Sequence, residues 1–269
     1  MQINIGEAVQ LRRGDCLRAM ESLPDHSVDL MICDLPYGVL RACKWDTCID
    51  LRVFWLLVQR VLKPRGVVLA FGAQPFTSEL LKSNLEWFRY SMVWRKSRPT
   101  GFQHCRARPL TSHEDILMFS PANSAAGPQN AANRSAYNPQ GLKHLDKPVR
   151  RPAGRKVKYM GRTMGASLQE WTNYPRTVLE FESVANPVHN TQKPVDLIRY
   201  LIRTYSEPGQ VVLDPTMGSG STGVATIEEG RLFSGIELDP DYFDIALGRI
   251  EAALELTRSE GAEVSTVAA

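Results

Sequence analysis

The sequence predicts an α/β fold: a doubly wound, mostly parallel sheet with helices on both faces and an inserted lobe. Short β-rich runs alternate with helical ones in two stretches, residues 1–120 and 176–256. Some of these runs are continuously apolar, as expected of strands that are buried on both faces. A glycine-rich turn joins one such strand to a helix. A chain of 269 residues, 43% of them hydrophobic, is long enough for one such domain with an insertion.

The first stretch contains four predicted strands and one predicted helix. Residues 28–33, 66–71, 88–94 and 115–119 have the apolar, β-branched or aromatic character of strands, and 50–62 has the apolar spacing of an amphipathic helix. A strand, a helix and another strand in succession favour parallel pairing with the helix covering one face.

Residues 121–175 break this pattern. Asn, Pro, Gly, Ala and Gln dominate the beginning of this region, and eight Lys or Arg face a single acid, Asp146, between Lys143 and Arg162. Because no apolar periodicity is present, the region is predicted to be an insertion or a mobile surface lobe.

The α/β pattern resumes at residue 176. Strands are predicted at 178–181, 210–213 and 232–237, and helices at 194–205, 220–229 and 240–256, the first of them beginning at a proline. Residues 257–269 are polar and small, which predicts a flexible tail.

Composition narrows the classes of protein. The five cysteines are odd in number and form no C-x-x-C pair, so neither a disulfide framework nor a zinc site is predicted, and no metal is expected. The N-terminus lacks the apolar core of a secretory signal, and the longest run without polar side chains, 66–73, is too short to cross a bilayer. These features predict a cytoplasmic protein, and the net charge of +3 by itself indicates no particular partner.

The turn after the strand at 210–213 predicts a ligand site. Gly218 and Gly220 allow the backbone to turn tightly and to approach a ligand closely. Asp214 ends this strand and Glu237 ends the next, and in nucleotide-binding folds an acid about 20 residues on binds the ribose hydroxyls. The turn has no Walker lysine, so a nucleoside held through its ribose is favoured over a phosphate ligand. The alternative is a tight connection without a ligand.

A second turn, Asp34-Leu35-Pro36-Tyr37, follows the strand at 28–33. It could be no more than a Pro-Tyr turn that ends the strand. Chemically, the Asp34 carboxylate and the Leu35 carbonyl, held by Pro36, offer two acceptors for the hydrogens of an exocyclic base amine. The lone pair of such an amine is delocalised into the ring, and these acceptors would stabilise the positive charge that develops when it reacts. Tyr37 could stack on a base taken out of a duplex.

With these motifs in this order, the chain resembles the DNA amino-methyltransferases of the β arrangement, in which the base motif precedes the cofactor motif. The matching segments are 14–17, 23–30, 34–37, 189–194 (HNTQKP, against the family's H-x-T-Q-K-P), 214–223 and 235–238, while 44–46, 74–76 and 113–114 resemble phage and prophage members. The resemblance implies a Rossmann-like fold and S-adenosylmethionine as the methyl donor. The cofactor residues that it implies are Asp15, Cys16, Thr191, Lys193, Asp214, Pro215, Thr216, Met217, Gly218, Ser219, Gly220, Glu237 and Leu238. Asp15 and Cys16 are expected beside the adenine of the cofactor, and Thr191 and Lys193 near its methionine end.

The first residue of the base motif bears on the substrate. In this family Asp at that position accompanies N6-adenine and Ser accompanies N4-cytosine, so Asp34 favours direct attack by the N6 of a flipped-out adenine. Leu35 replaces the commoner proline but keeps its carbonyl, and Thr216-Met217 replaces a Phe-containing pair. The alternatives are N4-cytosine methylation, methylation of protein glutamine or of RNA amines, and a DNA-binding homologue without activity. The motif order favours DNA as substrate, and the intact motif residues argue against loss of activity.

Two basic sets are interpreted as contacts to double-stranded DNA, although either could be a solvated surface. The first surrounds Phe102 and His104, and the second lies in the insertion, which the resemblance makes the target-recognition region. Their members are Arg95, Lys96, Arg98, Arg106 and Arg108 in the first set, and Lys143, Lys147, Arg150, Arg151, Arg155, Lys156, Lys158 and Arg162 in the second. The resemblance also makes a homodimer and a role in restriction–modification possible, in a bacterium or a phage-infected host.

Overall fold

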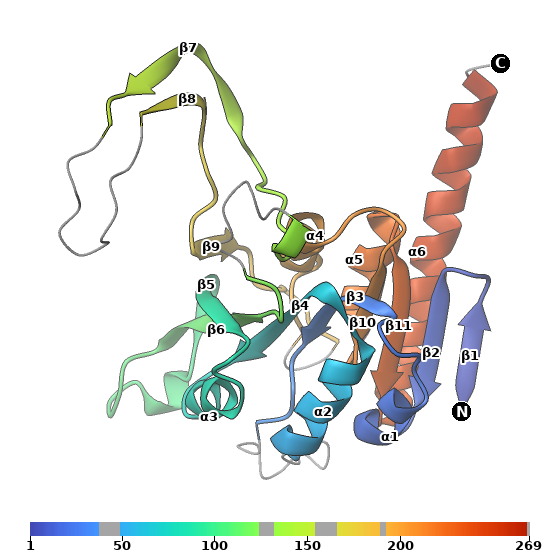
Figure 1. Ribbon diagram of the computed structural model, residues 1–269. Helices are drawn as coiled ribbons and strands as arrows, with labels where there is room; N and C mark the ends of the chain where they lie inside the picture. Colours follow the sequence, from blue (N-terminus) through green and yellow to red (C-terminus); the bar gives the residue numbers. More distant parts are fainter. Residues whose placement is uncertain (38–48, 124–131, 154–165, 189–191, 268–269) are drawn as a thin grey trace. The chain divides into compact units, whose positions relative to one another are not determined.

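The computed structural model describes residues 1–37, 49–123, 132–153, 166–188 and 192–267 (Figure 1). The chain divides into two compact units, one formed by Met1–Tyr137 with Thr177–Ala269 and the other by Asn138–Arg176. The larger unit contains a nine-stranded sheet in the order β1-β2-β11-β10-β3-β4-β6-β5-β9. The predicted fold class is confirmed.

Parallel pairing dominates the centre of this sheet. β10 pairs in parallel with β11 on one side and with β3 on the other, and β3 pairs in parallel with β4. β1 and β6 run against their neighbours. The strands are β1 (Gln2–Ile5), β2 (Val9–Arg13), β3 (Val28–Cys33), β4 (Leu62–Gly72), β5 (Phe88–Thr100), β6 (Thr111–Phe119), β9 (Val178–Phe181), β10 (Val211–Asp214) and β11 (Leu232–Glu237). The carboxyl ends of β3, β4, β10 and β11 therefore share one edge.

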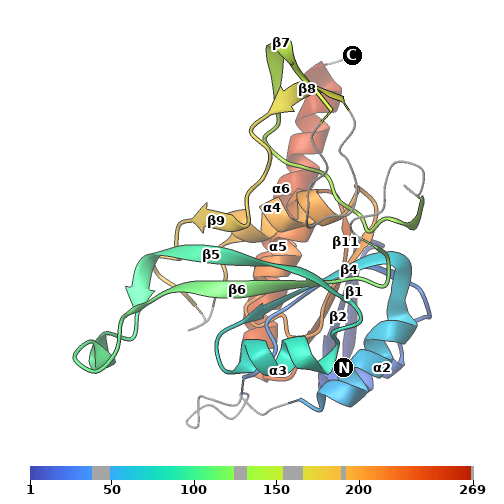
Figure 2. The ribbon, with the colours of Figure 1, turned by 60° about the vertical axis from the view of Figure 1, so that its left-hand side comes forward.

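Helices cover both faces of the sheet (Figure 2). Alternation along β3 shows the two layers, since Met31 and Cys33 pack in one apolar cluster and Leu30 and Ile32 in another. The first cluster includes side chains of α1 (Cys16–Glu21), α2 (Leu51–Val61) and α3 (Phe76–Ser83), and the second includes those of α4 (Val195–Tyr205) and α5 (Ser221–Glu228). The buried side of α6 (Pro240–Val267) packs in a third cluster with β2 and β11.

Most element predictions are confirmed, with three differences. The short strands β1 and β2 and the helices α1 and α3 were not predicted. β5 and β6 extend beyond the predicted strands and are joined through a 3-10 turn, η1 (Phe102–His104), which makes a long hairpin. The flexible tail predicted for 257–269 is corrected, because α6 continues to Val267 through residues rich in the helix formers Ala and Glu.

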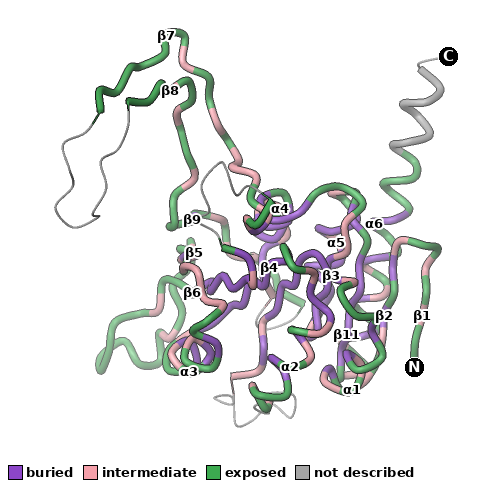
Figure 3. The backbone as a smooth tube through the Cα atoms, viewed as in Figure 1, coloured by how far each residue is buried: buried purple, intermediate pink, exposed green. Residues whose placement is uncertain are grey.

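The smaller unit, Asn138–Arg176, is shorter than the predicted insertion of 121–175. It contains an antiparallel pair, β7 (Lys143–Arg151) and β8 (Ser167–Thr172), where no regular structure was predicted. Figure 3 shows that both strands are largely exposed. A ribbon with two exposed faces needs no apolar alternation, which explains why the sequence pattern did not reveal it.

Candidate active site

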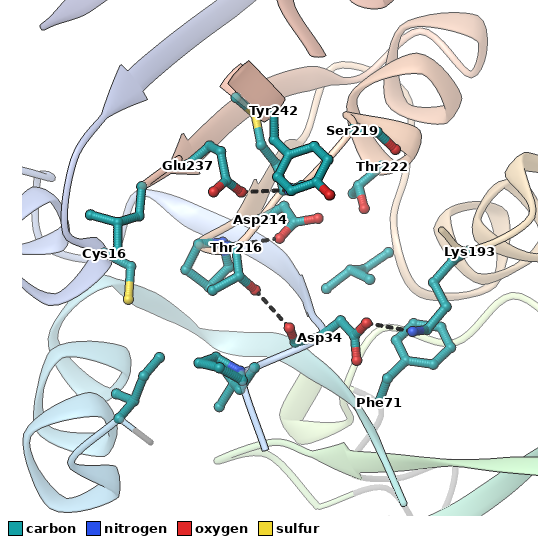
Figure 4. A pocket seen from close by; sticks show the side chains of 18 of the residues that line it. Cys16, Asp34, Phe71, Lys193, Asp214, Thr216, Ser219, Thr222, Glu237 and Tyr242 are labelled. Atoms are coloured by element: carbon teal, nitrogen blue, oxygen red, sulfur yellow. Dashed lines mark hydrogen bonds and ion pairs between the residues drawn. The ribbon is translucent and has the colours of Figure 1, made fainter. Parts of the chain in front are cut away.

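A cavity of about 420 Å³ lies at the carboxyl edge of the central strands (Figure 4). Its walls come from the ends of β3, β10 and β11, the start of α1 and the segment before α4. The predicted site residues that line it are Asp15, Cys16, Asp34, Leu35, Pro36, Tyr37, Lys193, Asp214, Pro215, Thr216, Met217, Gly218, Ser219, Glu237 and Leu238. The base motif and the glycine-rich turn thus share one cavity. Thr191 lies outside the described residues.

The two turns are also bonded to each other. The Thr216 hydroxyl donates to the backbone carbonyl of Asp34 across 3.2 Å, and the Thr216 N–H donates to Asp214 Oδ1 across 3.0 Å. Parallel pairing of β10 with β3, with Leu213 beside Met31, brings the ends of the two strands together. The sheet topology therefore dictates this contact.

The glycine-rich turn requires glycine at its end. Gly218 has φ +50° and Gly220 has φ +79°, values that favour glycine. A Cβ on Gly220 would lie 2.9 Å from the Cβ of Ala246 and 3.0 Å from its Cα. The turn thus approaches α6 more closely than a side chain would allow.

Two acids form the part of the wall that ends β10 and β11. Glu237 accepts from the Gly218 N–H at 2.8 Å and from the Asp239 N–H at 2.9 Å, which fixes its carboxylate. Burial raises the pKa of Glu237 above its ordinary value, although these amides oppose the shift. Burial likewise raises the pKa of Asp214 to about 7, against the hydrogen bonds from Thr222 and Thr216. Both carboxylates would gain from a ligand that supplies hydroxyls or positive charge.

The base motif forms a second polar corner of the cavity. Tyr37 donates its hydroxyl hydrogen to Asp34 Oδ1 across 2.7 Å, and Lys193 Nζ donates to Asp34 Oδ2. Burial, and then the charge of Asp34, raise the pKa of Tyr37, so its hydroxyl remains a donor at neutral pH. The Tyr37 ring stacks on Phe76 with centroids 4.8 Å apart and planes at 23°. The Asp34 carboxylate is thus held by two donors beside an aromatic surface.

Two lysines lie in surroundings that differ from those expected. Lys193 was expected near the methionine end of a cofactor, but its ammonium pairs with Asp34 and lies 3.2 Å from Glu114 Oε2. Lys96 was expected to contact DNA, but its ammonium pairs with Glu114 and its side chain is only 13% exposed. The expectation for Lys96 is corrected, because an ammonium buried against a carboxylate is not available to a phosphate. Sequence reasoning gave Glu114 no role, although an acid next to a strongly apolar strand run is a usable signal.

The other basic residues that the structure describes lie on two exposed surfaces. Arg98, Arg106 and Arg108 are exposed on the β5–β6 hairpin, where the Phe102 side chain is 77% exposed, and Arg95 pairs with Glu180 at 3.2 Å. On β7 the exposed members are Lys143, Lys147, Arg150 and Arg151. Arg155, Lys156, Lys158 and Arg162 lie outside the described residues.

The described ranges hold neither a metal cluster nor a membrane span. Within them, no group of three or more His, Cys, Asp or Glu side chains is arranged to hold a metal ion. None of the helices in those ranges combines the length and apolar character that a membrane span needs. Cys16, Cys33 and Cys105 are free thiols, and Cys43 and Cys48 fall outside the described part of the chain.

Comparison with known proteins places this geometry in a family. Residues 28–248 match the family model N6_N4_Mtase, described as DNA methylase. The type II methyltransferase M.HinfI of Haemophilus influenzae is 27% identical over 280 residues, covering 93% of this chain and 70% of that protein. The DNA adenine methyltransferase YhdJ of Escherichia coli K12 is 28% identical over 287 residues, covering 96% and 88%.

Solved structures share the fold. The PvuII DNA methyltransferase, cytosine-N4-specific, aligns with a TM-score of 0.65 and 17% identity, covering 91% of this chain and 90% of that one. A DNA modification methylase of Thermus thermophilus, complexed with S-adenosyl-L-methionine, aligns with a TM-score of 0.58 and 22% identity, covering 91% and 95%.

Proposed function

The chain belongs to the N6/N4 family of DNA methylases, and on this premise we propose that it methylates the N6 amine of adenine in double-stranded DNA, with S-adenosylmethionine as donor. The observation that carries the proposal is the single cavity that holds both the Asp34 turn and the Asp214–Gly218 turn. The similarity to a DNA adenine methyltransferase and the Asp at the first position of the base motif favour adenine.

The residues of the cavity fit this cofactor. Glu237, fixed by two backbone amides, faces the cavity where ribose hydroxyls would need acceptors. The close approach of Gly220 to Ala246 keeps the turn flat enough for a ligand to lie against it. Burial, and then the charge of Asp15, raise the pKa of Cys16 to about 12, so its neutral thiol suits an apolar wall beside a purine. When bound, S-adenosylmethionine supplies a methyl group on a positively charged sulfur.

The remaining predicted cofactor contacts follow from this placement. Asp15 and Cys16 are assigned to the adenine of the cofactor, and Asp214 lies where a cationic part of the ligand would relieve its burial. The turn from Pro215 to Ser219, with Leu238, completes the wall. Thr191 stays a prediction from the family motif.

Catalysis by this chain depends on Asp34. Its carboxylate accepts one hydrogen of the N6 amine, and the carbonyl of Leu35 accepts the other. As the amine attacks, positive charge develops on N6, and the fixed carboxylate stabilises it. After transfer, N6 must lose one proton, for which Asp34 is the nearest base. Tyr37 keeps the carboxylate oriented through its hydroxyl and offers its ring to the flipped-out base.

The DNA is proposed to lie against the two exposed basic surfaces. β5 runs in the same direction as β4, so its continuation from Arg95 to Thr100 extends past the sheet edge at which the cavity lies. This hairpin, with Arg98, Arg106 and Arg108, and the basic strand β7 of the smaller unit would contact phosphates. The smaller unit would thereby serve as the target-recognition region. Homodimerisation and cytoplasmic location stay predictions.

Expression in bacteria that lack DNA methylation tests the proposal. Nucleoside mass spectrometry of their DNA should reveal N6-methyladenine. N4-methylcytosine alone would show that the same site acts on the other base. Unmodified DNA, together with binding of DNA by the purified protein, would favour a homologue without activity.

A further inference from the structure

Four charged side chains form a continuous series of ion pairs behind the base motif. Asp34 pairs with Lys193, Lys193 lies 3.2 Å from Glu114, and Glu114 pairs with Lys96. The Lys193 ammonium also lies 5.1 Å from the centre of the Phe71 ring, and that of Lys96 lies 5.4 Å from the ring of Trp94. The series joins the base motif to the root of the β5–β6 hairpin.

Strand register explains why these groups meet. Trp94 is paired with Glu114, and Phe71 with Ile116, across antiparallel strands, so these side chains share one face of the sheet. Lys96 lies two residues beyond Trp94 and projects from the same face. Lys193 reaches this face from the segment just before α4, which packs on it.

Burial makes the series costly as a structural contact. The side-chain exposures are 10% for Lys193, 13% for Lys96 and 15% for Glu114. Removing such charges from water costs several kcal/mol each, and apolar side chains of similar size would usually stabilise a fold as well or better. The placement next to Asp34 suggests that the charges serve the reaction.

We propose that Glu114 is a positioning residue for methyl transfer, which holds Lys193 and balances its charge so that Asp34 stays available to the amine. The inference rests on the proposed function. Lys193 must lie against Asp34 to orient it, but a lone ammonium there would repel the positive charge that develops on N6. The carboxylate of Glu114, itself fixed by Lys96, compensates the ammonium from the side away from the amine. Burial opposes ionisation of Glu114, yet the two lysines outweigh it and lower its pKa, so the compensating charge is present at neutral pH.

The effect should fall on the chemical step. Glu114→Gln keeps the size of the side chain and removes its charge, so Lys193 would be compensated by Asp34 alone. The rate of methyl transfer in a single turnover, with DNA and S-adenosylmethionine saturating, should fall about 10- to 100-fold, the range expected for one uncompensated charge near the reacting atoms. The Kd for S-adenosylmethionine and the melting temperature should stay near those of the wild type.

Glu180→Gln is the matched control, because Glu180 also pairs with a cation of β5, Arg95, but its side chain is 62% exposed. That variant should react at the wild-type rate. Lys96→Gln should cause a smaller loss than Glu114→Gln, and the double variant should be no slower than Glu114→Gln, because Lys96 acts through Glu114.

Three results would overturn the inference. They are a wild-type rate for Glu114→Gln, losses in the double variant that multiply, and a loss that appears only in cofactor affinity or melting temperature. In each case the wild-type protein would still make N6-methyladenine, so the proposed function would stand. A wild-type protein that transfers no methyl group would end both.

Discussion

The Thr216 hydroxyl and the Asp34 carbonyl, 3.2 Å apart, join the turn after β10 to the turn after β3. The contact places the glycine-rich turn and the base motif at adjacent corners of one cavity. A methyl donor held by the first turn and an amine held by the second would therefore meet without rearrangement of the sheet. The predictions below depend on this arrangement.

Gly220 should tolerate no side chain. Gly220→Ala would place a Cβ 2.9 Å from that of Ala246 in a backbone with φ +79°, so both strain and overlap oppose it. We expect a loss of about 2–5 kcal/mol in the free energy of unfolding, with weaker cofactor binding. Gly209→Ala is the control, because φ is +78° and nothing lies within 4 Å of the added Cβ. It should cost about 1–2 kcal/mol and leave cofactor affinity unchanged, as denaturant unfolding and calorimetry would reveal. Equal losses in the two variants would contradict the steric explanation.

Cofactor affinity should increase as pH rises through about 7. Burial raises the pKa of Asp214 to about 7, and the ionised form attracts a cationic ligand more strongly than the neutral form does. Titration calorimetry between pH 6 and pH 8 should show a falling Kd with proton release on binding. Asp214→Asn should bind weakly at every pH in that range. A wild-type Kd that does not vary with pH would disprove the role of Asp214.

The unliganded protein should show the opposite trend in stability. Because the pKa of Asp214 is higher in the folded chain than its ordinary value of 3.8, the folded state retains a proton that the unfolded state loses. The contribution of this group to stability therefore decreases from about pH 4 to about pH 7. Asp214→Asn should melt at a higher temperature than the wild type at pH 8, and the difference should shrink toward pH 4. No difference between the two proteins at pH 8 would argue that Asp214 is not strained by burial.

The exposed hairpin should contribute to DNA binding through its charge. Replacing Arg106 and Arg108 by Ser should weaken duplex binding and reduce the slope of log K against log salt by about two, since each phosphate contact contributes about 0.9. Lys82→Ser/Arg258→Ser removes two exposed cations from α3 and α6 and is the matched control. Ser at Lys143, Lys147, Arg150 and Arg151 tests β7 in the same assay. Slopes that match the wild type for both basic surfaces would place the DNA elsewhere.

The sequence predicted the centre of the sheet and the two turns because their signals are local. Residues 28–33 and 232–237 are nearly continuous apolar runs, and glycines mark the turn at 218–220. β1 and β2 were missed because four or five residues of alternating polarity resemble a loop. The Rossmann-like sheet order then followed from the motif order rather than from any single element.

The ion-pair series could not be predicted, since it depends on tertiary contacts. Lys96, Glu114 and Lys193 come from three segments, and only the pairing of β5 with β6 and the packing of α4 bring them together. In the sequence, Lys96 looks like a member of a basic cluster and Lys193 like a member of a cofactor motif. Burial reassigns both, and burial is not visible in a local pattern.

The role of Asp34 is tested most directly by measuring methyl transfer and cofactor binding in the same variant. Asp34→Ala should reduce the single-turnover rate of N6-adenine methylation by about 100- to 1,000-fold, the cost of losing one preorganised stabilising group. Calorimetry on the same sample should show a Kd for S-adenosylmethionine within a few-fold of the wild-type value. Near-normal transfer, or a collapse of cofactor binding, would contradict the assignment of Asp34 as the residue that holds the adenine amine.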